Sequence, residues 1–251
     1  MIAGSGVNLP LMRKLSATYE TSRLPGKIVI PDSIGSAGAI KAALDGAIDL
    51  GLTSRPLQER EKAAGLKQIQ YARSAVAFAA HPSVPVDSIS VADLLEIYSG
   101  AKRQWPDGQT IAPQLMYKGD SVNAILVSQI KGFSSAINEA WHNKYWQVHY
   151  NDFSMAEAIA KLEGSIGFTD SSFVYLAQGK MKLLQLEGVA PTADNILRGA
   201  YHLEREMYFI YRDPLEPSAI AFLDYVFSPE GRRIIQAAQA IPVARLANGN
   251  R

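Results

Sequence analysis

The sequence predicts an α/β fold in which helices flank a sheet. Two observations favour it. Short apolar runs at residues 27–30 and 49–52 are typical of buried strands, and helical spacing of apolar residues lies between them. A longer apolar run at residues 74–80 indicates a central strand. A strand-turn-helix-strand succession of this kind is the pattern of a sheet covered by helices.

The first elements follow from spacing and turn chemistry. Pro10 suits the first turn of a helix, which Leu11, Met12, Leu15 and Tyr19 continue. Residues 27–30 predict a strand, residues 40–47 a helix face, and residues 49–52 the next strand.

The remaining elements are assigned in the same way. Residues 91–98 predict a helix closed by Gly100, and residues 125–130 another, whereas residues 141–150 are aromatic-rich and predicted to be irregular. Asp152 or Ser154 is expected to cap a helix that ends at Gly164. The other expected strands are 74–80, 111–117, 166–168 and 207–211, and the closing helices are 218–227 and 229–238.

Composition excludes several classes of protein. The chain has 251 residues, 47% hydrophobic and 20% charged, which suits one large domain or two small lobes. A net charge of +1 gives no reason to expect nucleic acid as a partner. The absence of cysteine excludes disulfides, thiolate metal sites and cysteine catalysis. No run of about 18 apolar residues predicts a membrane span.

Three short turns are suited to holding an anion, and each opens a predicted helix. They are residues 4–10, 34–38 and 119–123. The first N–H groups of a helix lack intrahelical partners and carry partial positive charge, so several such turns could bind phosphate or a similar oxyanion without a cofactor. The third is the weakest, because Asp120 is negative.

The first two turns and three further segments resemble those of a known protein family. Residues 4–10, 33–36 and 45–51, the segment 163–168 and the ending 222–243 together resemble the periplasmic phosphate-binding proteins of ABC importers. The resemblance covers nearly the whole chain in order. It implies the two-lobed type II periplasmic-binding-protein fold, with two hinge crossings. Lobe 1 would comprise residues 1–78 and 205–251, and lobe 2 residues 79–204.

The resemblance implies ligand roles for the first two turns. The first turn would contribute Asn8 and the backbone amide of Leu9, and the second Ser36 and Ala37. Some relatives place a proton-accepting aspartate after the next strand, where this chain has Ser54 and then Arg55. We expect Arg55 to be the main cation. Without that aspartate, discrimination between phosphate and sulfate should be poorer.

The third turn departs from the family pattern. Asp120, Ser121, Val122 and Asn123 occupy the positions of a Ser-Gly-Thr-like motif, and no arginine stands just upstream. Lys118 could supply the positive charge of the missing arginine. Its ammonium is a point charge, however, and does not bind two oxygens at once as a guanidinium does. Asp120 could orient Arg55, accept a ligand proton, or serve only as a helix cap.

Plainer interpretations stay open. Ser36 could be only a helix cap, and Arg55 could pair with Glu59 at the surface. The aromatic residues Trp141, Tyr145, Trp146 and Tyr150 could form a stacking platform, although a lobe core with an exposed patch is favoured. The four histidines lack metal-ligand spacing, and Ser121 lacks the sequence context of a hydrolase nucleophile.

The leading hypothesis is an extracytoplasmic receptor for a tetrahedral oxyanion, most simply phosphate, that delivers it to a membrane ABC permease. We expect no enzyme activity, no cofactor, no metal and a monomer. The alternatives are a sensor or adhesion-type module with a degraded pocket, or an enzyme using the same cradle. Residues 2–6 lack the pattern of a signal sequence, and we expect a protein that is either cytosolic or begins after a removed signal. The resemblance favours a periplasmic or lipid-anchored extracellular protein.

Overall fold

The chain forms two compact units in a computed structural model that describes residues 1–22, 27–144, 146–176 and 180–245. Unit 1 comprises Met1–Ser74 and Arg205–Arg251, and unit 2 comprises Ala75–Glu204. The chain therefore passes from unit 1 to unit 2 and back once.

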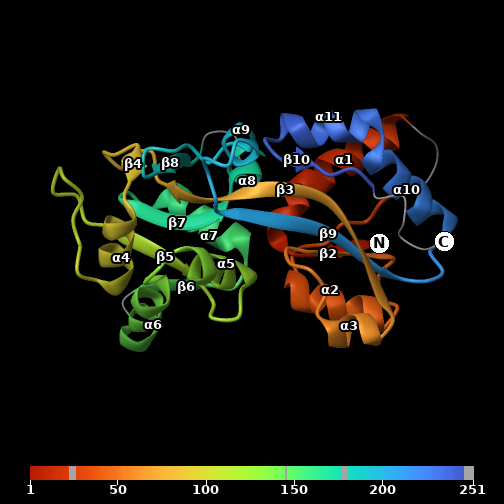
Figure 1. The fold of residues 1–251 in the computed structure, drawn as a ribbon, viewed down its shortest axis with the longest axis horizontal. Coiled ribbons are helices and arrows are strands. Elements are labelled where there is room, and N and C mark those ends of the chain that lie inside the picture. Colours follow the sequence, from red (N-terminus) through yellow and green to blue (C-terminus); the bar gives the residue numbers. More distant parts are fainter. Residues whose placement is uncertain (23–26, 145, 177–179, 246–251) are drawn as a thin grey trace. The chain divides into compact units, whose positions relative to one another are not determined.

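Unit 1 has a mixed sheet with helices on both faces (Figure 1). Strand β1 (Ile2–Gly4) pairs in parallel with β2 (Leu50–Thr53), which pairs antiparallel with β9 (Glu204–Arg212). The long strand β3 (Leu66–Ala80) pairs antiparallel with β10 (Ile241–Pro242). The helices are η1 (Gly6–Asn8), α1 (Leu9–Ser22), α2 (Gly35–Leu44), α3 (Glu59–Ala63), α10 (Pro217–Phe227) and α11 (Pro229–Ala237).

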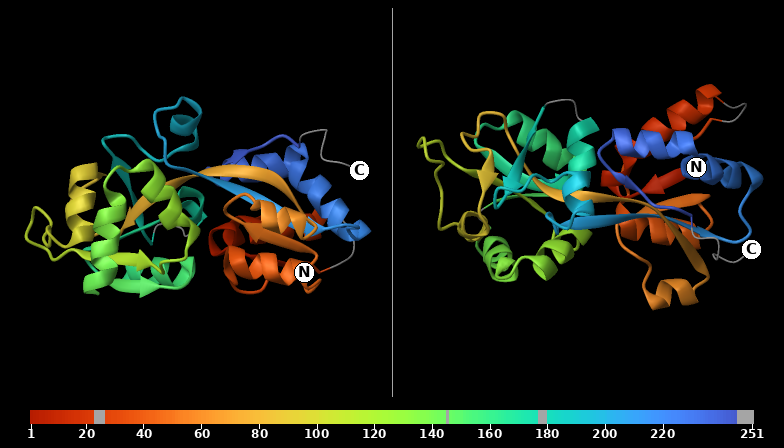
Figure 2. Two further views of the ribbon diagram at one scale, coloured as in Figure 1. Left: turned by 60° about the horizontal axis from the view of Figure 1, so that its bottom comes forward. Right: turned by 45° about the horizontal axis from the view of Figure 1, so that its top comes forward.

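The core of unit 1 lies on both faces of this sheet. Helix α2 packs Ala39, Ile40 and Ala43 against Ile210 of β9. On the opposite face the rings of Tyr71 and Phe209 lie 4.7 Å apart, and Phe222 of α10 meets Phe209 at 6.4 Å. Figure 2 shows α2 and α3 on one side of these strands and α1, α10 and α11 on the other.

Unit 2 is built around a second set of strands. Strand β7 (Ser165–Asp170) pairs antiparallel with β3 and in parallel with β5 (Ala112–Met116), and β5 pairs in parallel with β6 (Gln147–His149). Strand β8 (Lys182–Leu186) pairs with β3 and with β4 (Ser88–Ile89). The helices are α4 (Val91–Ser99), α5 (Ser121–Gln129), α6 (Phe133–Asn143), α7 (Asp152–Lys161), α8 (Ser171–Leu176) and α9 (Ala193–Leu197).

Most predicted elements are present, and a few predictions are wrong. Residues 27–30 form no strand. The Ile2 amide donates to the Val29 carbonyl at 2.9 Å, whereas the Ile28 amide donates to the Glu20 carboxylate. The region 141–150 is not irregular throughout, because it contains the end of α6 and strand β6. Helix α7 is capped by Asn151, whose side chain accepts from the Ser154 amide, and not by Asp152 or Ser154.

Candidate functional site

The first two predicted anion turns are tied together within unit 1. The Gly4 carbonyl, at the end of β1, accepts from the Ile34 amide at 3.1 Å and from the Ser33 hydroxyl at 3.2 Å. The Gly35 amide at the start of α2 donates to Ser33 Oγ at 3.3 Å. The openings of η1 and α2 are therefore fixed relative to one another by one carbonyl.

Glycine is required at position 4 because the backbone is crowded there. Its φ is +157°, and a Cβ at this residue would lie 2.2 Å from the Leu52 carbonyl oxygen. The Ser5 amide donates to that same oxygen at 2.9 Å, which draws the first turn against β2. This close approach brings Ser5 beside Ser54, the residue that follows β2.

Four polar side chains meet at this point, and we call them the hydroxyl cluster: Ser5, Asn8, Ser36 and Ser54. The Ser5 and Ser54 hydroxyl oxygens lie 2.7 Å apart, and Asn8 Nδ2 donates to Ser54 Oγ at 3.1 Å. The Ser54 amide donates to Ser36 Oγ at 3.2 Å. The structure thus brings together three of the residues predicted to bind ligand.

Tyr71 fixes the orientation of Asn8. Its phenol donates to Asn8 Oδ1 at 2.7 Å, and both residues are fully buried. With its oxygen occupied, Asn8 can present only its amide hydrogens to the cluster. An amide group aimed in this way favours an acceptor, such as an oxyanion, as the group to be bound.

The hydroxyl cluster has hydrogen-bond donors to spare. Only one of Ser5 and Ser54 can donate in their shared bond, so the other hydroxyl proton has no acceptor among the described residues. Ser36 Oγ accepts from the Ser54 amide, and its own proton likewise finds no acceptor there. Helix α2 begins without a side-chain cap on its N-cap residue, Ile34. These groups suit an incoming acceptor.

Leu9 and Ala37 are the other predicted ligand contacts in these two turns, and they differ in how available they are to a ligand. The amide of Leu9, at the start of α1, donates to the Gly6 carbonyl, so it would have to share that bond to reach a ligand. Ala37 is exposed in the first turn of α2, one residue after Ser36. Its role stays a prediction.

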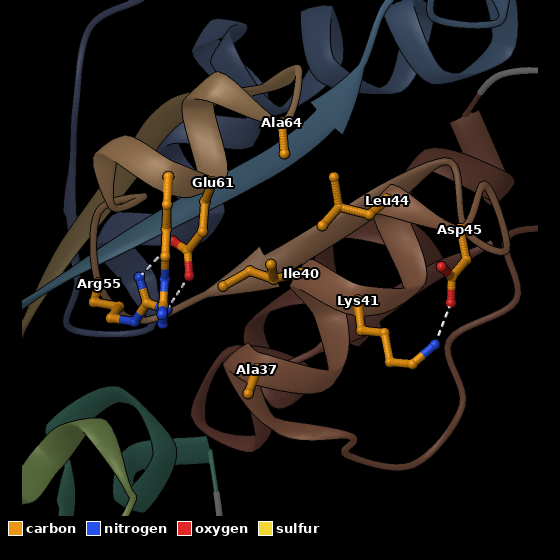
Figure 3. A pocket seen from close by; sticks show the side chains of 9 residues that line it. Ala37, Ile40, Lys41, Leu44, Asp45, Arg55, Glu61 and Ala64 are labelled. Atoms are coloured by element: carbon orange, nitrogen blue, oxygen red, sulfur yellow. Dashed lines mark hydrogen bonds and ion pairs between the residues drawn. The ribbon is translucent and has the colours of Figure 1, made fainter.

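Arg55 already has a carboxylate partner. Its guanidinium makes two bonds to Glu61 of α3, Nη1 to Oε2 at 2.9 Å and Nη2 to Oε1 at 2.8 Å (Figure 3). These bonds raise the pKa of Arg55 and lower that of Glu61. The alternative of a pair with Glu59 is wrong, since Glu59 pairs with Lys62. Arg55 as main cation stays a prediction, but its charge is already balanced.

A pocket of about 520 Å³ lies between α2 and α3, on the side to which Arg55 turns (Figure 3). Its two other features of note are Lys41, paired with Asp45 at 2.5 Å, and an apolar side formed by Ile40 and Leu44. None of the hydroxyl-cluster residues lines it. This pocket is therefore separate from the hydroxyl cluster, and two of the cations that line it, Lys41 and Arg55, are each paired with a carboxylate.

The third predicted turn lies in unit 2 and opens α5. Asp120 is its N-cap, accepting from the Val122 amide at 2.9 Å, so the predicted capping role is confirmed. Asn123 Nδ2 donates to the Tyr117 carbonyl at 2.9 Å, while its Oδ1 is buried without a partner among the described residues. Val122 is buried and Ser121 half-buried. Their roles as ligand contacts stay predictions.

The aromatic residues on either side of β6 contact the two residues that precede this turn. The Lys118 ammonium lies over the Trp141 ring at 5.7 Å, and Tyr117 stacks on Tyr150 at 5.8 Å. Tyr150 is 77% exposed, whereas Trp141 and Trp146 are half-buried. Tyr145 lies outside the described residues. This arrangement agrees better with a lobe core that has an exposed patch than with an open stacking platform.

Other chemistries find little support in the described part of the chain. It contains no group of three or more histidine, aspartate or glutamate side chains placed to hold a metal ion. Within those same residues, no helix is both long and apolar enough to cross a bilayer.

Comparison with known proteins supplies the family. A family model described as a PBP superfamily domain matches residues 1–230. The chain belongs to the PBP superfamily.

Relatives within this superfamily are named for phosphate. The chain is 27% identical over 263 residues to the phosphate-binding protein PstS of Bacillus subtilis, covering 99% of this chain and 83% of that protein. It is 22% identical over 249 residues to PstS of Borreliella burgdorferi, covering 94% and 86% of the two chains.

Solved structures of the superfamily share the fold. A Clostridium perfringens protein assigned as a phosphate ABC transporter substrate-binding protein, solved with bound phosphate, matches with a TM-score of 0.82 at 24% identity, over 96% of this chain and 98% of that one. An ABC-type phosphate transport receptor from Vibrio cholerae matches with a TM-score of 0.65 at 20% identity, over 96% and 98%. The predicted type II periplasmic-binding-protein fold is therefore confirmed.

Sequence reasoning missed Ser5 and Tyr71. Ser5 lies inside the first predicted anion turn, but the direction of its side chain depends on the contact of that turn with β2. Tyr71 gives no local signal, because its bond to Asn8 joins residues 63 positions apart.

Proposed function

We propose that this chain is an extracytoplasmic solute-binding protein that binds phosphate and delivers it to an ABC permease. The observation that carries the proposal is the hydroxyl cluster, which offers at least two unused hydroxyl protons beside the opening of α2. Phosphate is rich in acceptor oxygens. The names of the relatives support phosphate as the anion, and an ABC-type phosphate transport system as the destination.

The proposed binding residues are Ser36, Ser54 and Asn8, supported by Ser5 and Tyr71. Backbone amides of Leu9 and Ala37, together with Arg55, are further proposed contacts in unit 1. For unit 2 we propose, separately, the third-turn residues Asp120 to Asn123 as anion-binding residues. Because hydrogen bonds and charge perform the whole task, binding requires neither cofactor nor turnover. We propose no catalytic role for any residue.

Titration calorimetry with inorganic phosphate tests the proposal. We expect saturable binding to the wild type, and Ser36→Ala should weaken it by about 0.5–1.5 kcal/mol, or up to about 3 if the hydroxyl bonds a charged oxygen. Ser99→Ala, in α4 of unit 2, is the matched control and should bind as the wild type does. Absence of phosphate binding by the folded wild type would contradict the proposal and favour a module with a different or degraded pocket.

A second assay addresses catalysis. The wild type, incubated with a chromogenic phosphoester, should release no product above the buffer rate. Release that phosphate inhibits, and that Ser36→Ala removes, would instead identify an enzyme that uses the same cradle.

A further inference from the structure

Arg205, the second residue of β9, is the most deeply buried charged side chain among the described residues of unit 1. It is only 2% exposed, and its Nε and Nη2 atoms are buried without a hydrogen-bond partner among the described residues. Among the described residues, no carboxylate forms an ion pair with Arg205. A guanidinium stays protonated inside proteins, so this group is a buried positive charge without a matching anion.

Such an arrangement is costly unless an anion completes it. Buried charges in proteins are paired or coordinated, and removing one partner of a pair leaves a large desolvation penalty uncompensated. The neighbouring acid Glu206 does not fill this role, since it accepts from Tyr208 at 2.7 Å and from Gln70 at 3.5 Å. Arg205 therefore has the properties of a residue prepared for a bound oxyanion.

The register of β9 places Arg205 near the hydroxyl cluster. Strand β2 pairs Leu52 with Phe209 and Thr53 with Tyr208, and continuing that register sets Ser54 opposite Met207. Arg205 lies two residues before Met207 in the sequence, about 7 Å along β9. Its side chain is on the same face of the sheet as that of Met207, because side chains alternate along a strand. An arginine side chain extends far enough to cover that interval.

The same face carries the residues that orient the cluster. Phe209, two residues past Met207, contacts the ring of Tyr71, whose hydroxyl fixes Asn8. Arg205, Met207 and Phe209 therefore form a row on the face that supports the cluster. Arg55 has its guanidinium bonded to Glu61 of α3, which leaves the position of ligand cation open.

We propose that Arg205 is the cation of the anion site, its guanidinium binding oxygens of the phosphate that the Ser36 and Ser54 hydroxyls hold. This inference rests on the proposed function and adds the group that neutralises the ligand.

Phosphate titration of four variants tests the inference. Arg205→Gln and Arg205→Met should weaken binding at least about 30-fold, as expected for lost hydrogen bonds to a charged group. Arg205→Lys should retain part of the affinity, because it keeps the charge and loses the fork. Arg60→Gln, in α3, changes the net charge equally and should alter binding less than about threefold.

Thermal melts in phosphate-free buffer separate binding from folding. Because the unpaired guanidinium is unfavourable without ligand, Arg205→Met should melt at or above the wild-type temperature. Phosphate should then raise the melting temperature of the wild type and not that of the variant. A phosphate-free melting temperature far below the wild type in both the Gln and Met variants would identify a structural arginine and overturn the inference.

Failure of the inference and failure of the proposed function give different results. Wild-type affinity in Arg205→Gln overturns the inference and leaves phosphate binding intact. A wild type that does not bind phosphate overturns both, unless sulfate stabilises it and Arg205→Gln abolishes that effect. That last result would support Arg205 as the cation for another oxyanion.

Discussion

Asn8 illustrates how a single residue connects the core to the binding cluster. Tyr71→Phe would leave Asn8 Oδ1 buried without its 2.7 Å donor. We expect the free energy of unfolding to fall by about 1–3 kcal/mol, the cost of an unsatisfied buried polar group. Urea unfolding measures this, with Tyr175→Phe, at a residue 55% exposed, as control. Equal stability of the two variants would show that the bond is not formed.

His149 in β6 should make stability depend on pH. Its ring is 5% exposed, Nε2 bonds Gln114 Oε1 at 2.8 Å, and burial lowers its pKa. The unfolded chain therefore takes up a proton near pH 6.5 before the folded chain does, so protonation favours unfolding.

The sign of this pH dependence follows from the lowered pKa of His149. The free energy of unfolding should decrease as the pH falls below about 6.5, and His149→Gln should flatten that decrease. Urea unfolding at several values between pH 7.5 and about pH 5 checks it. An unchanged slope in His149→Gln would assign the pH dependence to other groups.

The β1 strand and the turn that follows it depend on Gly4. Gly4→Ala would place a methyl group 2.2 Å from the Leu52 carbonyl, so we expect a loss of about 1–3 kcal/mol from overpacking. Gly46→Ala is the control, because that glycine also has a positive φ, +70°, but open space around it. Unfolding by urea should show the larger loss at position 4. A larger loss at Gly46 would mean that φ, and not crowding, limits this turn.

Helix α5 allows capping to be separated from ligand recognition. Asparagine caps a helix as well as aspartate does, so Asp120→Asn should leave stability unchanged, whereas Asp120→Ala should cost about 1 kcal/mol. If Asp120 also accepts the phosphate proton, Asp120→Asn should reduce the preference for phosphate over sulfate.

Competition titration with both anions at fixed ionic strength measures that preference. We expect the Asp120→Asn variant to discriminate less than the wild type, because sulfate has no proton to donate and a carboxylate repels it. Unaltered discrimination would restrict Asp120 to its observed role as a cap.

Elements with strong local signals were predictable. Helix α4 ends at Gly100, whose φ of +85° suits glycine, and the C-terminal part of β3 is a continuous apolar run. Residues 27–30 have the composition of a strand and yet form none, since the Ile28 amide donates to a side chain, Glu20. Propensity cannot report such a competing partner.

For the whole molecule, the order of motifs predicted the type II fold and the family. The individual motifs predicted Asn8, Ser36 and Ser54 as ligand contacts, and the structure groups these three residues in one cluster. The motifs could not reveal that Glu61 binds Arg55, because that choice of partner depends on where α3 begins, at the N-cap Gln58. Nor could they reveal that Arg205 is buried, because that depends on strand pairing between distant segments. Long-range register is therefore the information that the sequence alone lacked.

A crystal structure of the wild type grown in phosphate tests the central claim most directly. We expect phosphate bound at Ser36 and Ser54, with an Asn8 amide hydrogen and the Arg205 guanidinium directed toward its oxygens and Arg55 still bonded to Glu61. Phosphate bound elsewhere, with the hydroxyl cluster bonded only to itself and Arg205 unpaired, would contradict the account.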